Sequence, residues 1–281
     1  MRFVILHYHI FKNAGTTIEN LLQQNFPHTF ARFEGAGRNA QLSGAELLSF
    51  IRSRPTVRAV SSHALRYPKP YAAGFVFFDL LFLRDPIDRL RSIYNHFLQA
   101  APSDDPLSFL AHQSGLRGFV EGLLDQHPHI ANNPQVNMLA TDGAYTRPPG
   151  AADLARATGT MLEAALVGVV DCFWESLIAG QYFWHPAFPN LNVAVAPANV
   201  TAPVESTLAM RLAEVEDACG PQLYRQLAAL NELDMELVQR GRAEVWRRFQ
   251  LVPGHDERLL SLHDEVRRLC GTAPWGESEM A

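Results

Sequence analysis

Residues 2–22 read RFVILHYHIFKNAGTTIENLL. The apolar run from Phe3 to Leu6 is typical of a buried strand, and the residues after Thr17 have the spacing of an amphipathic helix. A turn at residues 9–17 joins the two patterns and contains one lysine, one glycine and two threonines. This order predicts a strand, a tight turn and a helix that opens directly from the turn.

The turn has the composition of an anion-binding site. Backbone N–H groups of such a turn and of a helix N-terminus point toward an anion, and a lysine adds a full positive charge. The pattern differs from the nucleotide-triphosphate loop G-x-x-x-x-G-K-[ST], because Lys12 precedes Gly15. A purely structural turn is the alternative. The residues that we expect to bind an anion are Lys12, Asn13, Ala14, Gly15, Thr16 and Thr17.

A second informative segment, residues 75–99, reads FVFFDLLFLRDPIDRLRSIYNHFLQ. Its apolar first half suits a strand buried on both faces of a parallel sheet. Asp85 and Pro86 then form a good N-cap and first helical residue. Arg84 should therefore lie at the carboxyl end of a strand, where open α/β sheets bind ligands, and Ser92 about two turns into the helix. The alternatives are a capped helix start with exposed charges, or the acidic strand of a nucleotide-triphosphate site.

Weaker patterns complete the predicted fold. Residues 57–63, VRAVSSH, indicate a strand followed by His63, and residues 165–170 indicate another strand. We expect further helices over residues 107–124, 151–164, 172–183, 205–218 and 221–249. The whole pattern predicts an α/β protein with a central, mainly parallel sheet, in one domain over residues 1–281.

The composition limits the function. The chain has 281 residues, 47% of them hydrophobic, which is enough for a substantial core. Its 24 basic and 29 acidic residues give a net charge of −5, which argues against nucleic-acid binding. Three widely spaced cysteines imply no disulfide framework. No run of 18 apolar residues is present, so we expect a cytoplasmic protein without a membrane span.

The motifs together resemble those of PAPS-dependent sulfotransferases (PAPS is 3′-phosphoadenosine 5′-phosphosulfate), in the carbohydrate branch that includes heparan-sulfate 2-O-sulfotransferases. The family's loop is roughly H-I-P-K-T-G-G-T-[ST], and this chain differs from it at Phe11, Asn13 and Ala14. The family's second motif is R-D-P-x-x-R-x-x-S-x-Y. It is matched by Arg84, Asp85, Pro86, Arg89, Ser92 and Tyr94.

This resemblance implies a fold and a set of roles. The fold would be a P-loop-NTPase-like, three-layer α/β/α arrangement. Lys12 would contact the leaving oxygen of the phosphosulfate, Arg84 and Ser92 would bind the 3′-phosphate, and His63 would be the general base. Histidine suits that role because its ordinary pKa is about 6.5. His9 would position the loop.

The resemblance also implies what the protein acts on. PAPS would be the donor and PAP (3′-phosphoadenosine 5′-phosphate) the product, with no metal required. The acceptor would be a hydroxyl of a glycan or glycolipid. Asn199 and Thr201 are further candidates for nucleotide contacts. Two alternatives are an ATP-dependent small-molecule kinase and a catalytically silent homologue that binds a nucleotide or glycan.

Overall fold

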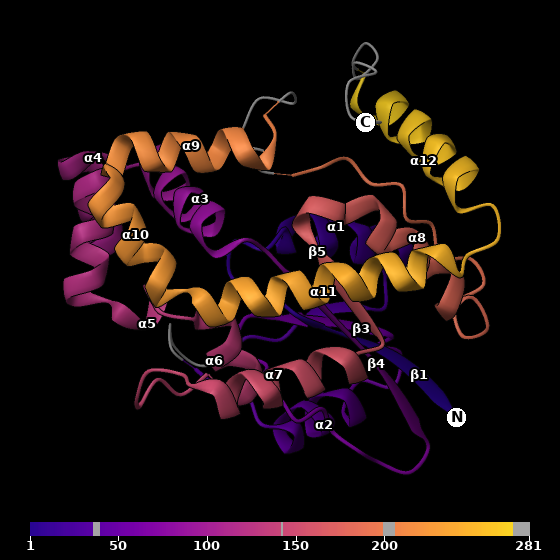
Figure 1. Cartoon of the computed structure of the whole chain (residues 1–281). Coiled ribbons are helices and arrows are strands. Elements are labelled where there is room, and N and C mark those ends of the chain that lie inside the picture. Colours follow the sequence, from indigo (N-terminus) through magenta and orange to yellow (C-terminus); the bar gives the residue numbers. More distant parts are fainter. Residues whose placement is uncertain (36–39, 142, 199–205, 272–281) are drawn as a thin grey trace. The chain divides into compact units, whose positions relative to one another are not determined.

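The computed structural model describes residues 1–35, 40–141, 143–198 and 206–271 (Figure 1). The chain divides into two compact units. We call Met1–Leu83, Thr158–Asn199 and Arg240–Ala281 the sheet unit, and Arg84–Ala157 and Val200–Gln239 the helical unit. The single domain expected over residues 1–281 stays a prediction, because compact units can fold together or separately.

The sheet unit contains a five-stranded sheet in the order β2-β3-β1-β4-β5, with every neighbouring pair parallel. The strands are β1 Arg2–Tyr8, β2 Phe30–Arg32, β3 Ala59–Ser62, β4 Phe75–Leu83 and β5 Leu166–Val169. The prediction of an α/β protein with a parallel sheet is confirmed. Strand β2 was not predicted, because its three residues are too few for a periodic pattern.

Helices lie on both faces of this sheet. Figure 1 shows α1 (Gly15–Asn25) and α8 (Phe173–Trp184) on one face, and α2 (Gly44–Arg52) with the end of α7 (Ala151–Glu163) on the other. The unit also contains η1 (Val170–Cys172), the end of α11 (Glu232–Gln250) and α12 (His255–Cys270).

The alternation of side chains along the strands builds the core. Leu80 and Phe82 of β4 join Ile5 of β1 in a buried cluster that also takes Ile18 of α1 and Leu177 of α8. The same parallel register pairs Tyr8, the last residue of β1, with Ser62, the last residue of β3. Residues that follow these two strands are therefore neighbours at one edge of the sheet.

Helices are the only regular elements among the described residues of the helical unit. They are α3 Pro86–Gln99, α4 Pro106–Gln126, α5 Pro128–Ala131, α6 Pro134–Ala140, α9 Leu208–Cys219 and α10 Pro221–Leu230, with the first parts of α7 and α11. The predicted start of α3 is confirmed, since Oδ1 of Asp85 accepts hydrogen bonds from the N–H groups of Ile87 and Asp88, at 2.9 and 3.0 Å.

One helix prediction was wrong in extent, and one helix was missed. The helix expected over residues 221–249 is two helices, α10 and α11, separated at Asn231. There the side-chain Nδ2 donates to the carbonyl oxygens of Ala131 and Leu227, which fixes the break. Helix α12 was not predicted at all.

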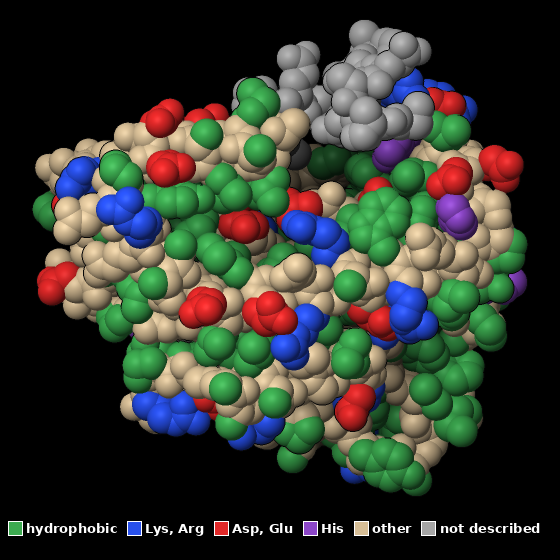
Figure 2. Space-filling model, viewed as in Figure 1, with side chains coloured by type: hydrophobic (Ala, Val, Ile, Leu, Met, Phe, Trp, Pro, Cys, Tyr) green, Lys and Arg blue, Asp and Glu red, His purple; other side chains and the backbone are tan. Residues whose placement is uncertain are grey.

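The visible surface mixes charges of both signs. Figure 2 shows basic and acidic side chains interspersed on this face. On α11, Arg242 pairs with Asp171, and Arg247 and Arg248 both pair with Glu244. Among the described residues, no helix is long and apolar enough to cross a membrane.

Candidate functional site

The predicted anion loop connects β1 to α1. Lys12 and Ala14 both have left-handed backbone conformations, with φ of 65° and 60°. Helix α1 begins at Gly15, and no described side chain caps it. The first N–H groups of a helix have no partner within the helix, and a change of backbone handedness just before them forms a concave anion site. The loop therefore has the geometry expected of an anion cradle.

Two of the six predicted loop residues turn their side chains into the protein. Asn13 is buried, and its Nδ2 donates to the carbonyl oxygen of Phe82 on β4 at 2.8 Å. Its backbone N–H donates to the carbonyl oxygen of Ile10. Thr17 is also buried, and its Oγ1 accepts from the N–H of Ala198 at 3.0 Å. These two residues anchor the loop, while Lys12 and Thr16 keep partly exposed side chains.

Only glycine fits at position 15, because the ring of His9 lies against its backbone. A Cβ atom on Gly15 would lie 1.9 Å from both Cδ2 and Nε2 of that ring, closer than atoms can approach. His9 therefore lies directly on the first residue of α1. Its Nδ1 is 3.2 Å from Oε1 of Glu19, which comes from the same helix. The histidine that we expected to position the loop does contact it.

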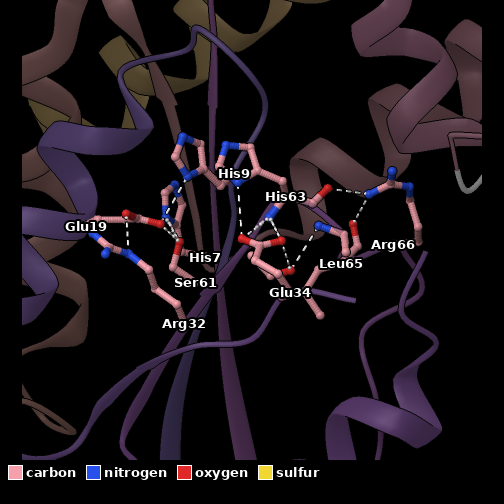
Figure 3. A network of polar contacts seen from close by, with 11 residues as sticks. His7, His9, Glu19, Arg32, Glu34, Ser61, His63, Leu65 and Arg66 are labelled. Carbon is pink, nitrogen blue, oxygen red and sulfur yellow. Dashed lines mark hydrogen bonds and ion pairs between the residues drawn. The ribbon is translucent and has the colours of Figure 1, made fainter. Parts of the chain in front are cut away.

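Beneath the loop lies a buried polar cluster, which we call the inner network: His7, His9, Glu19 and Ser61 (Figure 3). Oε1 of Glu19 accepts the hydroxyl proton of Ser61 at 2.8 Å, and Oε2 accepts from Nε of Arg32 at 2.8 Å. Because the Ser61 hydroxyl donates to Glu19, Nδ1 of His7 donates to Ser61, at 2.8 Å. Each residue of the inner network is thus hydrogen-bonded to at least one other.

The inner network holds neutral imidazoles around one ionised carboxylate. Burial lowers the pKa of His7 well below its ordinary value and also lowers the pKa of His9. Burial raises the pKa of Glu19, but hydrogen bonds from His9 and Ser61 and the nearby charge of Arg32 outweigh it and lower that pKa to about 2.

His63 follows β3 and lies outside this network. Its ring stacks on His9 with 3.7 Å between ring centroids, and 46% of its side chain is exposed. Nδ1 of His63 lies 3.1 Å from Oε1 of Glu34 (Figure 3). The sheet register therefore brings the predicted base beside the predicted loop, through the ring of His9. Glu34 was missed in the sequence, because it lies 29 residues away and outside any motif.

The other predicted site residues belong to the helical unit. Nε of Arg84 lies 2.7 Å from Oδ2 of Asp88, whose Oδ1 accepts from Nε of Arg211 at 2.8 Å. Burial raises the pKa of Asp88, but Arg84 and Arg211 outweigh it and lower the pKa. Ser92 is buried, one helical turn beyond Asp88. The predicted phosphate ligands thus flank a buried carboxylate that two arginines neutralise, and no motif identified Arg211.

Other candidate features lie elsewhere. Asn199 and Thr201 fall outside the described residues. Within the described part of the chain, no group of three or more His, Cys, Asp or Glu residues could hold a metal ion. An open groove of about 720 Å³ lies in the helical unit, lined by α4, α10 and the turn between α9 and α10. None of the predicted site residues lines it.

Comparison with known proteins assigns no activity. No protein-family model matches the chain. A protein of Archaeoglobus fulgidus described as uncharacterized is 26% identical to it over 243 residues. The similarity covers 84% of this chain and 94% of that protein, so the two chains are similar over most of their lengths.

Proposed function

We propose that this protein is a sulfotransferase that moves the sulfuryl group of PAPS to an acceptor hydroxyl on a carbohydrate or glycoconjugate. One observation carries the proposal: the half-exposed ring of His63 is separated from the start of α1 only by the ring of His9. A candidate base thus lies beside a candidate anion loop. The sequence resemblance identifies the anion as the phosphosulfate of PAPS. On the same basis, we propose that the fold is P-loop-NTPase-like.

The proposed reaction is an in-line transfer. The acceptor oxygen forms a bond to sulfur while the bond between sulfur and the 5′-phosphate oxygen breaks, and PAP leaves. His63 takes the proton of the acceptor hydroxyl, a contribution that is typically about 10²–10⁴-fold. Lys12 and the N–H groups at the start of α1 stabilise the charge that develops on the departing phosphate oxygen.

In this proposal, Arg84 and Ser92 bind the 3′-phosphate of the nucleotide. A guanidinium group and a hydroxyl group are suitable donors, and hydrogen bonds to a charged group are worth about 1.5–3 kcal/mol each. The carboxylate of Asp88 would repel a phosphate, but Arg84 and Arg211 both pair with it. Two guanidinium groups against one carboxylate leave these three side chains with an excess of positive charge.

Thermal unfolding with PAP and with ADP, each with and without Mg²⁺, tests the donor. A ligand at about 100 times its Kd stabilises the folded state by roughly 2.7 kcal/mol, or several degrees in Tm. We expect a metal-independent shift with PAP that Ser92→Ala reduces. Ser92→Ala is a cleaner probe than Arg84→Ala, because Arg84 also neutralises buried Asp88. Ser114→Ala, on the exposed side of α4, is the matched control.

Transfer of labelled sulfuryl groups to a panel of glycans and glycolipids tests the reaction. Transfer that requires His63 would support the proposal. A thermal shift with ADP and Mg²⁺ but not with PAP would contradict it and favour a kinase. Binding of PAP without transfer to any acceptor, and without an effect of His63→Ala, would instead indicate a silent nucleotide-binding homologue.

A further inference from the structure

The carboxylate of Glu34 accepts hydrogen bonds from residues at the end of β3 and just after it. Oε1 lies 3.1 Å from Nδ1 of His63, and both carboxylate oxygens accept the backbone N–H of His63 at 3.1 Å. Oε2 also accepts the hydroxyl proton of Ser62, at 3.2 Å. All three donors belong to two consecutive residues, so one carboxylate fixes both the backbone and the ring at this point.

We propose that Glu34 is a positioning residue that sets the tautomer of His63 and thereby makes Nε2 the basic atom. An ionised carboxylate only accepts hydrogen bonds. Nδ1 of His63, which faces it, therefore carries the ring proton, and the neutral ring presents its lone pair at Nε2. The catalytic consequence of this assignment rests on the proposed function, whereas the tautomer itself does not.

The other side of the ring is held by the inner network. His63 stacks on His9, and His9 is in turn fixed by Glu19 and by the backbone of Gly15. The ring of His63 is thus constrained by a hydrogen bond at one edge and by a stacked ring on one face. A base held in this way keeps its orientation without reorganising during the reaction.

The neighbouring histidines are much less accessible than His63. His7 and His9 are 1% and 6% exposed. Nδ1 of His7 is engaged by Ser61, while Nδ1 of His9 faces Glu19 and its Nε2 edge rests on Gly15. Of the three stacked histidines, His63 is the one whose ring reaches solvent. His63 is therefore the histidine of this group that a substrate can reach, and Glu34 determines that Nε2 is its basic nitrogen.

Nitrogen NMR of the ligand-free protein tests the tautomer. Spectra recorded at pH about 8.5, above the ordinary pKa of histidine, report which ring nitrogen carries hydrogen. His63→Gln identifies the signals of His63 among the eleven histidines. We expect the Nδ1–H tautomer in the wild type and a mixture of tautomers in Glu34→Gln, because an amide can donate as well as accept. Glu163→Gln, at the exposed end of α7, is the matched control and should change nothing.

Kinetics test the catalytic consequence. Glu34→Gln should lower kcat roughly 10-fold, less than the loss of the base itself, and leave the KM for PAPS within about 2-fold. Glu34→Asp, which only accepts, should retain the Nδ1–H tautomer.

An Nε2–H tautomer in the wild type, or identical spectra for wild type and Glu34→Gln, would overturn the tautomer assignment. An unchanged kcat in an active enzyme would overturn the positioning role. A chain without any transfer activity would overturn the proposed function, and the spectra would still decide the assignment.

Discussion

The inner network and the pair formed by Glu34 and His63 use the same chemistry in different surroundings. Each joins imidazole to carboxylate, and the two are in contact through the stacked rings of His9 and His63. The side chains of His9 and Glu19 in the inner network are each 7% exposed, whereas the side chains of Glu34 and His63 are 43% and 46% exposed. Burial is therefore the property that separates them.

This difference predicts different roles. A buried polar group that loses its partner cannot turn to water, so the loss costs the folded state about 1–3 kcal/mol for each group. An exposed hydrogen-bonded pair contributes little to stability, because solvent replaces the lost partner. We call Glu34 and His63 the outer pair. Changes in the inner network should therefore lower the free energy of unfolding, whereas changes in the outer pair should lower activity.

The largest expected effect belongs to the outer pair. His63→Ala should lower kcat by about 10²–10⁴-fold, because the acceptor hydroxyl loses its base. The free energy of unfolding should stay within about 1 kcal/mol of the wild type, since the side chain is half-exposed. Turnover with PAPS and unfolding in denaturant measure the two quantities. A variant that loses several kcal/mol of stability, or retains full turnover, would contradict the separation of roles.

The inner network should show its effect as acid sensitivity. The pKa of Glu19 is about 2 in the folded protein against an ordinary 4.5, so the unfolded chain binds the proton first as the pH falls. The stability that Glu19 contributes is complete above pH 4.5 and is lost as the pH falls through about 2. It amounts to roughly 2 kcal/mol, after allowance for screening at the exposed Arg32.

Glu19→Gln tests this contribution. We expect the variant to unfold more easily than the wild type at pH about 7 by roughly this 2 kcal/mol, and the difference to shrink as the solution becomes acidic. His7 and His9 also make the folded state less stable as the pH falls. Because burial lowers both pKa values, stability begins to fall below pH 6.5 in either protein. Glu163→Gln is the control, and a pH-independent difference for Glu19→Gln would contradict the assignment.

The smallest effect concerns the loop that both regions support. Ala14 has φ of 60°, a conformation that costs about 1–2 kcal/mol for a residue with a Cβ atom. Ala14→Gly should therefore raise the free energy of unfolding by about 0.5–1 kcal/mol, after the larger entropy of glycine in the unfolded chain is subtracted. Ala243→Gly, at an exposed position within α11, should lower it by about 1 kcal/mol. Equal losses in both variants would show that Ala14 is unstrained.

Sequence patterns predicted the elements whose signals are local. The run from Phe75 to Leu83 is long enough to identify a strand, and Asp85 followed by Pro86 marks the start of α3 through local capping. The break at Asn231 and the short strand β2 were not predictable in this way. The first depends on a hydrogen bond to Ala131, and the second on pairing with β3.

The amino-acid sequence by itself determined the βα unit, the loop between Tyr8 and Gly15 and the candidate residue Lys12, because apolar periodicity and turn composition are properties of neighbouring residues. His63 became a candidate through the resemblance to the sulfotransferase family. Only the tertiary structure placed His63 on His9, and Glu34 beside His63. These contacts arise because β1, β2 and β3 end at the same edge of a parallel sheet. No local pattern encodes which distant strand ends become neighbours, because strand order follows from packing of the whole sheet.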